Sequence, residues 1–179
     1  MKYNYPKLIS CKVHNDNRGY LQEIYKRKDF RNNFKFAILA SSKKNVFRGL
    51  HFQKKNQQEK IVIIVKGSIV DFCIDLRKKS KTFLKVFKFY LKENSILYIP
   101  KGFAHGYLGI KNENKIVYFL SNYRQQKYER GLNLKDNKIN LKIWKKNLII
   151  SKKDQTNMYL DNFEKEIRTL WKITLVEFA

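Results

Sequence analysis

The feature that most constrains the fold is a series of short apolar runs, rich in β-branched and aromatic residues and bounded by turn formers. The clearest two are Lys60 to Lys66, KIVIIVK, and Ser68 to Leu76, SIVDFCIDL, which are separated only by Gly67. Such composition favours strands, and a lone glycine between two strands is typical of a tight turn. These runs are therefore predicted to form adjacent buried strands.

Similar runs recur through most of the chain, with few helical patterns before residue 155. We predict about nine strands at short intervals, a pattern typical of an antiparallel sheet closed on itself. The predicted fold class is mainly β, and a jelly-roll barrel of antiparallel strands fits it best. The further runs are 7–14, which alternates only weakly, and 20–25, 34–42, 46–53, 82–91, 95–99, 103–110 and 115–121.

The C-terminal part has a different pattern. Apolar residues recur at near-helical spacing from Met158 to Trp171, which predicts a short helix that packs on the barrel. A chain of 179 residues suits one domain with a substantial core. We expect a single domain over 1–179, with its barrel core at about 16–154 and the helical segment at about 155–179.

Charge and cysteine content limit the partners and the compartment. The formal net charge is +24, from 39 Lys and Arg against 15 Asp and Glu, but the cations are spread over nearly every segment. No nucleic-acid-binding signature accompanies them, so no nucleic-acid partner is expected. The two cysteines, Cys11 and Cys73, fit neither a disulfide framework nor a zinc site, which favours a reducing cytoplasm. No signal peptide or membrane-spanning window is present, so no membrane partner is expected.

One strand contains a histidine and an arginine within an apolar run, VFRGLHFQ at 46–53. Strict alternation along a strand places Phe47, Gly49 and His51 on one face and Arg48 on the other. A glycine beside an imidazole leaves room for a ligand, but a core histidine bonded to a backbone carbonyl explains the same pattern. The strand alone leaves both interpretations open.

The other two histidines differ in context. His14 adjoins a predicted turn and is expected on the surface, whereas His105, in PKGFAHGY, is placed to point inward like His51. Metal-binding barrels of this kind place a second histidine two residues after the first, where this chain has Gln53, and Glu59 lies too far along. We therefore expect no metal at this position.

Five motifs in order give the chain a recognisable likeness. It resembles the dTDP-4-dehydrorhamnose 3,5-epimerase family from about Asp16 to Asp154. The motifs are RGLHFQ (48–53), EKIVIIVKGSIVDFCIDLR (59–77), SKTF (80–83), IPKGFAHGY (99–107) and SKKD (151–154).

This resemblance implies a cupin-type jelly roll that acts without a cofactor on a nucleotide-diphosphate keto sugar. It also implies a homodimer that exchanges an N-terminal strand. By family role, His51 is the general base, Asp154 orients it, Lys60 lies near the ketone oxygen and Tyr118 is the acid on the opposite face. Epimerisation beside a ketone needs these groups: a base for a carbon-bound proton, a cation for the enolate and an acid on the other face.

The resemblance also implies contacts with the substrate. Arg48 and Arg18 resemble residues that contact the diphosphate, with Arg18 reaching over from the partner chain. His105 and Asp71 resemble a buried pair beside the sugar, and Gln53 is expected to line the same pocket.

The chain departs from the family pattern in two places. Phe36, Ile38 and Ala40 occupy positions that are usually polar and face the ligand, and of that run only Ser42 is retained. Where many members have a second tyrosine near C5 of the sugar, this chain has Arg124, preceded by Tyr123, and both are expected to contact substrate.

The predicted function is epimerisation of a nucleotide-linked 4-keto hexose at C3, C5 or both, in the biosynthesis of cell-surface polysaccharide sugars. The Arg124 replacement leaves epimerisation at C3 alone open. Two alternatives remain: a keto-sugar isomerase on the same scaffold, and a sugar-binding cupin without turnover.

Overall fold

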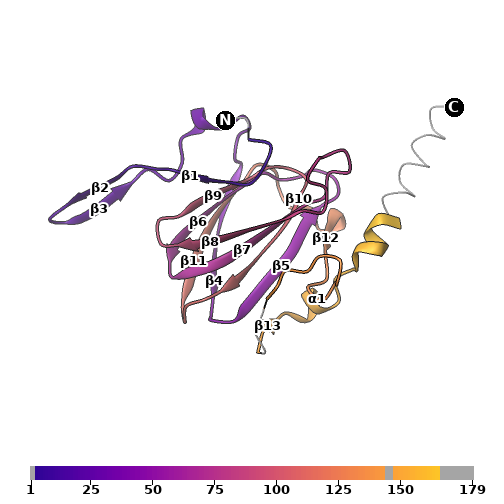
Figure 1. Cartoon of the computed structure of the whole chain (residues 1–179). Coiled ribbons are helices and arrows are strands. Elements are labelled where there is room, and N and C mark those ends of the chain that lie inside the picture. The colour runs from indigo at the N-terminus through magenta and orange to yellow at the C-terminus, as the bar shows by residue number, and fades with distance from the viewer. Residues whose placement is uncertain (1–2, 144–146, 166–179) are drawn as a thin grey trace.

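The computed structural model describes residues 3–143 and 147–165 and consists mainly of antiparallel strands in two facing sheets, as in a jelly roll (Figure 1). A five-stranded sheet has the order β1 (Lys7–Ile9), β9 (Ile96–Ile99), β6 (Lys60–Lys66), β11 (Asn114–Leu120), β4 (Phe36–Ser42). The other sheet has the order β12 (Glu129–Gly131), β5 (Val46–Gln53), β10 (Phe103–Gly109), β7 (Ser68–Asp75), β8 (Val86–Lys92), and β13 (Ile149–Ile150) pairs in parallel with β5. The predicted fold class is confirmed.

The core between the sheets follows from the alternation of these strands. Inward-facing residues such as Val62 and Ile64 of β6, Ile69 of β7 and Leu97 of β9 are fully or almost fully buried there. Cys73 lies in the same cluster, as expected for a small core residue, and both cysteines are free thiols. This cluster fills one part of the interior and leaves the part beside β4, β5 and β11 for the cavity described below.

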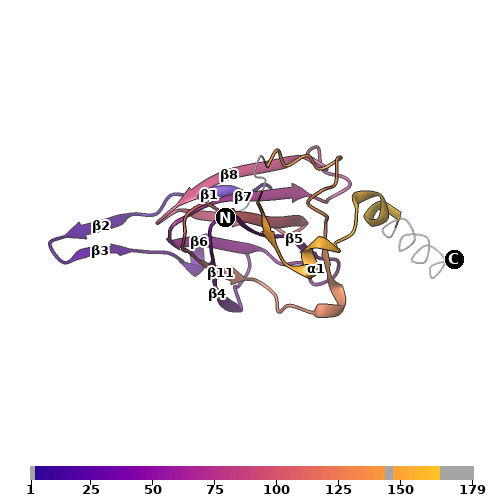
Figure 2. The ribbon, with the colours of Figure 1, turned by 90° about the horizontal axis from the view of Figure 1, so that it is seen from below.

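The C-terminal segment covers the outer face of the six-stranded sheet (Figure 2). The short helix α1 (Lys152–Gln155) and a helical stretch at 160–165 follow β13. Leu160 and Phe163 of that stretch are buried against the sheet, as predicted. The predicted start at Met158 is wrong because that residue bridges to Leu132, and residues 166–171 of the predicted helix lie outside the described residues.

A two-stranded arm projects from the sandwich near the N-terminus (Figures 1 and 2). It consists of β2 (Val13–Asp16) and β3 (Gly19–Gln22), and a 3-10 turn, η1 (Arg27–Asp29), follows it. The strand predicted at 20–25 is therefore shorter, and the run 7–14 is divided between β1 and β2. His14 is exposed on this arm, as predicted.

The strand predicted at 82–91 begins later than expected, at Val86. The preceding turn contains Leu84 in the left-handed region, at φ 62°, and Asp75 fixes the turn by accepting hydrogen bonds from Thr82 (2.7 Å) and Arg77 (2.8 Å). Burial raises the pKa of Asp75, but these hydrogen bonds outweigh it and lower that pKa to about 2. A side-chain bond across a turn overrides the strand propensity of the aromatic run.

Among the described residues, no helix has the length and apolar character needed to cross a bilayer.

Candidate active site

A β-bulge in β5 determines which side chains of VFRGLHFQ face the interior. His105 of β10 pairs with His51 and Tyr107 pairs with Arg48, so Gly106 alone opposes two residues of β5. Gly49 has φ +130°, and a Cβ there would lie 2.5 Å from the Cα of Gly106, so the close approach requires glycine. Because a bulge shifts the alternation by one residue, the two halves of β5 are out of phase.

This shift corrects the predicted faces of β5. Phe47 and Leu50 pack together on the outer side of the sheet, whereas Arg48 and His51 both line the interior cavity. The strict alternation that placed His51 with Phe47 is therefore wrong. A bulge also explains how one short strand presents both an arginine and a histidine to the same cavity.

The cavity lies between the two sheets and has a volume of about 430 Å³. The six-stranded sheet contributes His51 and His105, and the five-stranded sheet faces them with Lys60 and Tyr118. The segment 151–154 closes one side. The remaining lining residues are Ile38, Ala40, Arg48, Phe52, Gln53, Gln58, Tyr107, Leu120, Arg124, Glu129, Ser151, Lys153 and Asp154.

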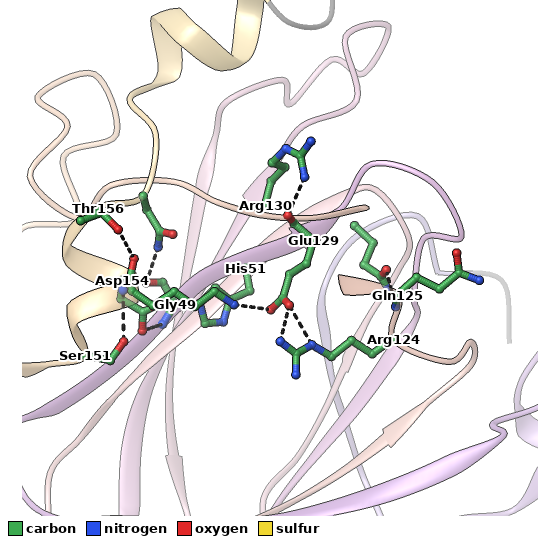
Figure 3. A network of polar contacts seen from close by, with 12 residues as sticks. Gly49, His51, Arg124, Gln125, Glu129, Arg130, Ser151, Asp154 and Thr156 are labelled. Carbon is green, nitrogen blue, oxygen red and sulfur yellow. Dashed lines mark hydrogen bonds and ion pairs between the residues drawn. The ribbon is translucent and has the colours of Figure 1, made fainter. Parts of the chain in front are cut away.

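His51 is held by a carboxylate from a distant segment. Its Nε2 donates to Oδ1 of Asp154 at 2.6 Å, and the imidazole is about one-third exposed to the cavity while Asp154 is buried (Figure 3). Burial raises the pKa of Asp154, but the bond and charge interaction with His51 outweigh it and lower that pKa. With Nε2 bonded in this way, the neutral ring carries its free lone pair on Nδ1.

Ser151 fixes the position of that carboxylate. It is the N-cap of α1, and its Oγ accepts from the backbone N–H of Asp154 at 3.1 Å. Ser, Thr, Asp and Asn are the side chains preferred at this position. The motif SKKD therefore places Asp154 in the first turn of α1, where it points at His51.

A second histidine–carboxylate pair lies behind the first. Nε2 of His105 lies 2.7 Å from Oδ2 of Asp71, and both residues are buried. The thiol of Cys73 donates to the other oxygen of Asp71 at 3.4 Å. Burial lowers the pKa of His105, and this effect exceeds the opposing effect of Asp71.

We expect this buried His105 to make stability fall as the pH drops from 7.5 to 5.5. The pKa of His105 lies below its ordinary 6.5, so in this window the unfolded chain binds more protons and acidification favours unfolding. The limiting slope is about 1.4 kcal/mol per pH unit for one proton. Urea unfolding at several pH values measures it. The slope should be smaller in His105→Asn, and equal slopes in the two proteins would contradict this assignment.

Lys60 and Tyr118 come from neighbouring strands, β6 and β11, and both point inward. Burial lowers the pKa of the Lys60 ammonium, while Asp71 and Glu129 partly oppose this. Burial also raises the pKa of Tyr118 well above its ordinary value, with Tyr107 and Asp71 adding to it. The phenol is therefore protonated at neutral pH, as a proton donor must be.

Arg48 lies at the other end of the cavity. Its Nε donates to Oγ of Ser42 at 2.9 Å, and Ser42 Oγ lies 2.8 Å from the hydroxyl of Tyr107. Its Nη2 donates to the backbone carbonyl of Ser41 at 3.2 Å, and Arg48 is exposed, so the N–H groups of Nη1 are available to a ligand.

A charged cluster at the rim was not expected from the sequence. Oε2 of Glu129 accepts from Nε of Arg124 at 2.8 Å (Figure 3). Nζ of Lys153 lies 3.2 Å from Oε1 of Glu129. Burial raises the pKa of Glu129, but these two cations outweigh it and lower that pKa. The cavity lining therefore contains four cations and two carboxylates. The cations are Arg48, Lys60, Arg124 and Lys153, and the carboxylates are Glu129 and Asp154.

Several predicted site residues lie outside the cavity lining. Arg18 is exposed on the projecting arm and pairs with Asp16, and Tyr123 stacks on Phe36 with ring centroids 5.5 Å apart. Asp71 lies behind His105. Gln53 does line the cavity, but its Oε1 accepts from the backbone N–H of Gln125 at 3.0 Å. Their roles toward a ligand stay predictions.

Two lining residues could have been found from the sequence. Tyr107 lies two residues after His105, and alternation alone places it on the same face. Lys153 directly precedes Asp154 in SKKD. Glu129, by contrast, had no signal, because its position depends on the turn before β12. No group of three or more His, Cys, Asp or Glu in the described parts of the chain is arranged to hold a metal ion.

Comparison with known proteins agrees with this geometry. The family model described as dTDP-4-dehydrorhamnose 3,5-epimerase matches residues 4–162. A relative of that name from Shigella flexneri is 36% identical over 156 residues, covering 82% of this chain and 86% of the relative.

Solved structures give the same result. The dTDP-4-dehydrorhamnose 3,5-epimerase of Sulfolobus tokodaii superposes with a TM-score of 0.79 at 36% identity, covering 87% of this chain and 90% of that one. A dTDP-6-deoxy-D-glucose-3,5-epimerase from Legionella pneumophila, solved with dTDP-4-keto-L-rhamnose, gives 0.84 at 26% identity and 90% coverage of both chains. The chain therefore belongs to the dTDP-4-dehydrorhamnose 3,5-epimerase family of isomerases.

Proposed function

We propose that this protein epimerises a nucleotide-linked 4-keto hexose at C3, C5 or both, without a cofactor, in the synthesis of sugars for cell-surface polysaccharides. The relative from Legionella pneumophila was solved with a dTDP-linked keto sugar, which supports this class of substrate. The free thiols of Cys11 and Cys73 are consistent with a reaction in a reducing cytoplasm.

The observation that carries the proposal is the placement of a base and an acid on opposite walls. His51, with its carboxylate, comes from the six-stranded sheet, and Tyr118 comes from the five-stranded sheet that faces it. Inverting a carbon centre requires removal of a proton from one face and delivery of a proton to the other. A sugar ring between the sheets meets both groups.

The reaction follows from these positions. His51 takes the proton from the carbon beside the ketone, and the C–H electron pair moves into the enolate. The ammonium of Lys60 stabilises the negative charge on the oxygen. Tyr118 then gives its hydroxyl proton to the opposite face of the same carbon. The proton on His51 and the charge on Tyr118 are restored by exchange with solvent.

The cations near the rim fit the rest of the substrate. Arg48 has free N–H groups at one end of the cavity, and Arg124 and Lys153 share a single carboxylate at the rim. A diphosphate adds two or more negative charges, and guanidinium groups bind it by paired hydrogen bonds. We assign the diphosphate to Arg48.

Solvent exchange tests the proposed function. The protein is incubated in deuterated water with dTDP-4-keto-6-deoxyglucose, and the C3 and C5 hydrogens are followed by NMR. We expect deuterium at C3, C5 or both, together with the inverted product. The site that exchanges also shows whether a chain with Arg124 acts at C3 alone. Absence of exchange in this and other nucleotide-linked 4-keto sugars would overturn the proposal.

The same spectra distinguish the two alternatives. A keto-sugar isomerase moves the carbonyl to another carbon, which changes the carbon spectrum without inverting C3 or C5. A binding protein without turnover binds the nucleotide sugar and leaves both hydrogens unexchanged.

We also propose a homodimer in which the arm of each subunit completes the partner's site. The outer face of the five-stranded sheet exposes Leu39 and Val65, and the arm exposes Tyr20 and Leu21. Arg18 lies between β2 and β3 of this arm, on the far side of the sandwich from its own rim (Figure 1). In a two-fold dimer, the exposed arm can reach the second copy and place Arg18 near its diphosphate.

Mixing two inactive variants tests this arrangement. Arg18→Ala and His51→Gln each lose activity alone, but a mixed dimer has one site with both residues intact if Arg18 acts across the interface. After the two are unfolded and refolded together, we expect about a quarter of wild-type activity, because half the dimers are mixed and each has one complete site. No recovery in a dimeric mixture would show that Arg18 does not act on the partner.

A further inference from the structure

Two hydroxyl groups and one guanidinium are hydrogen-bonded in series along the cavity wall, and the ring of Tyr118 lies beside them. Nε of Arg48 donates to Ser42 Oγ at 2.9 Å, and Ser42 Oγ lies 2.8 Å from the hydroxyl of Tyr107. Tyr107 in turn faces Tyr118, with ring centroids 6.5 Å apart.

The surroundings make these bonds persistent. Ser42 is 4% exposed and Tyr107 is 2% exposed, so neither hydroxyl exchanges its partner for bulk water. Each comes from a different strand, β4 or β10, and Tyr118 from β11 lies next to β4. The hydroxyl of Tyr107 therefore connects the two sheets at the acid.

The direction of donation is fixed for only one hydrogen bond of this series. The N–H of Arg48 can only donate, so Ser42 always accepts from it. Between Ser42 and Tyr107, either hydroxyl can donate. The Tyr107 hydroxyl can therefore accept from Tyr118 or donate to it, according to the direction in which each hydroxyl proton is turned.

We propose that Tyr107, supported by Ser42, is a positioning residue that holds Tyr118 as the proton donor and then stabilises its phenolate. This inference rests on the proposed function. In the resting site, Tyr118 donates to Tyr107, and Tyr107 donates to Ser42. When substrate is bound, the Tyr107 O–H turns to donate to the oxygen of Tyr118 and the Ser42 O–H donates to Tyr107, which frees the single proton of Tyr118 to point at the substrate carbon. After Tyr118 has given that proton to the carbon, the same Tyr107 O–H stabilises the phenolate oxygen, and no other proton is transferred in this step.

This role predicts a separation between exchange and inversion. His51 removes the substrate proton without help from Tyr107, so solvent deuterium still enters on the His51 face when the hydroxyl is absent. Delivery from the opposite face, however, depends on the position of Tyr118. Loss of the Tyr107 hydroxyl should therefore lower inversion more than exchange.

The test compares Tyr107→Phe with the wild type in deuterated water, using dTDP-4-keto-6-deoxyglucose. We expect inversion to fall about tenfold, a part of the 10²–10⁴-fold that a general acid supplies, while exchange without inversion stays within about twofold. Ser42→Ala should likewise lower the ratio of inversion to exchange. Tyr90→Phe is the matched control, because Tyr90 also bonds a serine, Ser68, but is exposed on β8 outside the cavity lining.

Each outcome decides a separate point. A wild type without exchange overturns the proposed function itself. A wild type that exchanges and inverts, with Tyr107→Phe unchanged or with both rates reduced equally, overturns only the role of Tyr107. If circular dichroism shows that Tyr107→Phe does not fold, the ratio of inversion to exchange is measured in Ser42→Ala instead and judged by the same criteria.

Discussion

Replacing His51 with Gln should reduce both deuterium exchange and inversion by about 10²–10⁴-fold, the range supplied by a general base. The glutamine keeps an N–H donor that can reach Asp154, which lies 2.6 Å from the imidazole, so the buried carboxylate retains a partner. The lone pair that takes the substrate proton is lost. NMR of the substrate in deuterated water measures exchange and inversion in one experiment.

The control for this variant is ligand binding. Calorimetric titration with dTDP should give a dissociation constant close to that of the wild type. Arg48, to which we assign the diphosphate, is unchanged in this variant. Asp154→Asn should lower exchange as well, since an amide can offer its N–H to the ring and favour the wrong tautomer. Exchange at the wild-type rate in His51→Gln would show that another group is the base.

Replacing Lys60 with Met should have opposite effects on activity and on stability. Exchange should fall about 10²–10³-fold, as it does when one group that stabilises a developing oxyanion is removed. The free energy of unfolding should rise, because burial disfavours the charged ammonium, as its lowered pKa shows, and a methionine of similar length has no charge to desolvate. Urea unfolding and the exchange assay measure the two effects on the same sample.

Lys66→Met is the matched control for Lys60→Met. Lys66 is the last residue of the same strand, is exposed and pairs with Glu113 outside the cavity lining. We expect its activity to stay within about twofold of wild type, since surface ion pairs contribute little. If Lys60→Met lost stability together with activity, the lysine would be a structural residue.

The strands that the sequence predicted best are those whose ends are marked by neighbouring residues. The bounds of β5 and β6 agree with the apolar runs at 46–53 and 60–66, because polar residues precede both runs and Gly67 follows the second. The run at 82–91 failed where Asp75, a residue of another strand, holds the turn around Leu84. A strand end fixed by a side chain of another strand has no signal within the run itself.

The candidate site shows the same division. His51, Lys60 and Tyr118 were identified by motif order, and the structure brings their side chains into one cavity. The face of Arg48 could not be predicted, since it depends on a bulge formed where Gly49 meets a glycine of β10. The pairing of Glu129 with Arg124 likewise depends on where a loop returns to the barrel rim.

The bond between His51 and Asp154 spans 103 residues, and it joins the barrel to a segment held by one turn of helix and a two-residue strand. Short peripheral elements of this kind open locally at a lower free energy than the core strands around them. Undocking of 149–155 would leave every strand of the barrel paired while His51 loses its carboxylate. We therefore expect inactivation on heating to precede the melting of the barrel, because His51 loses its carboxylate before the core strands separate.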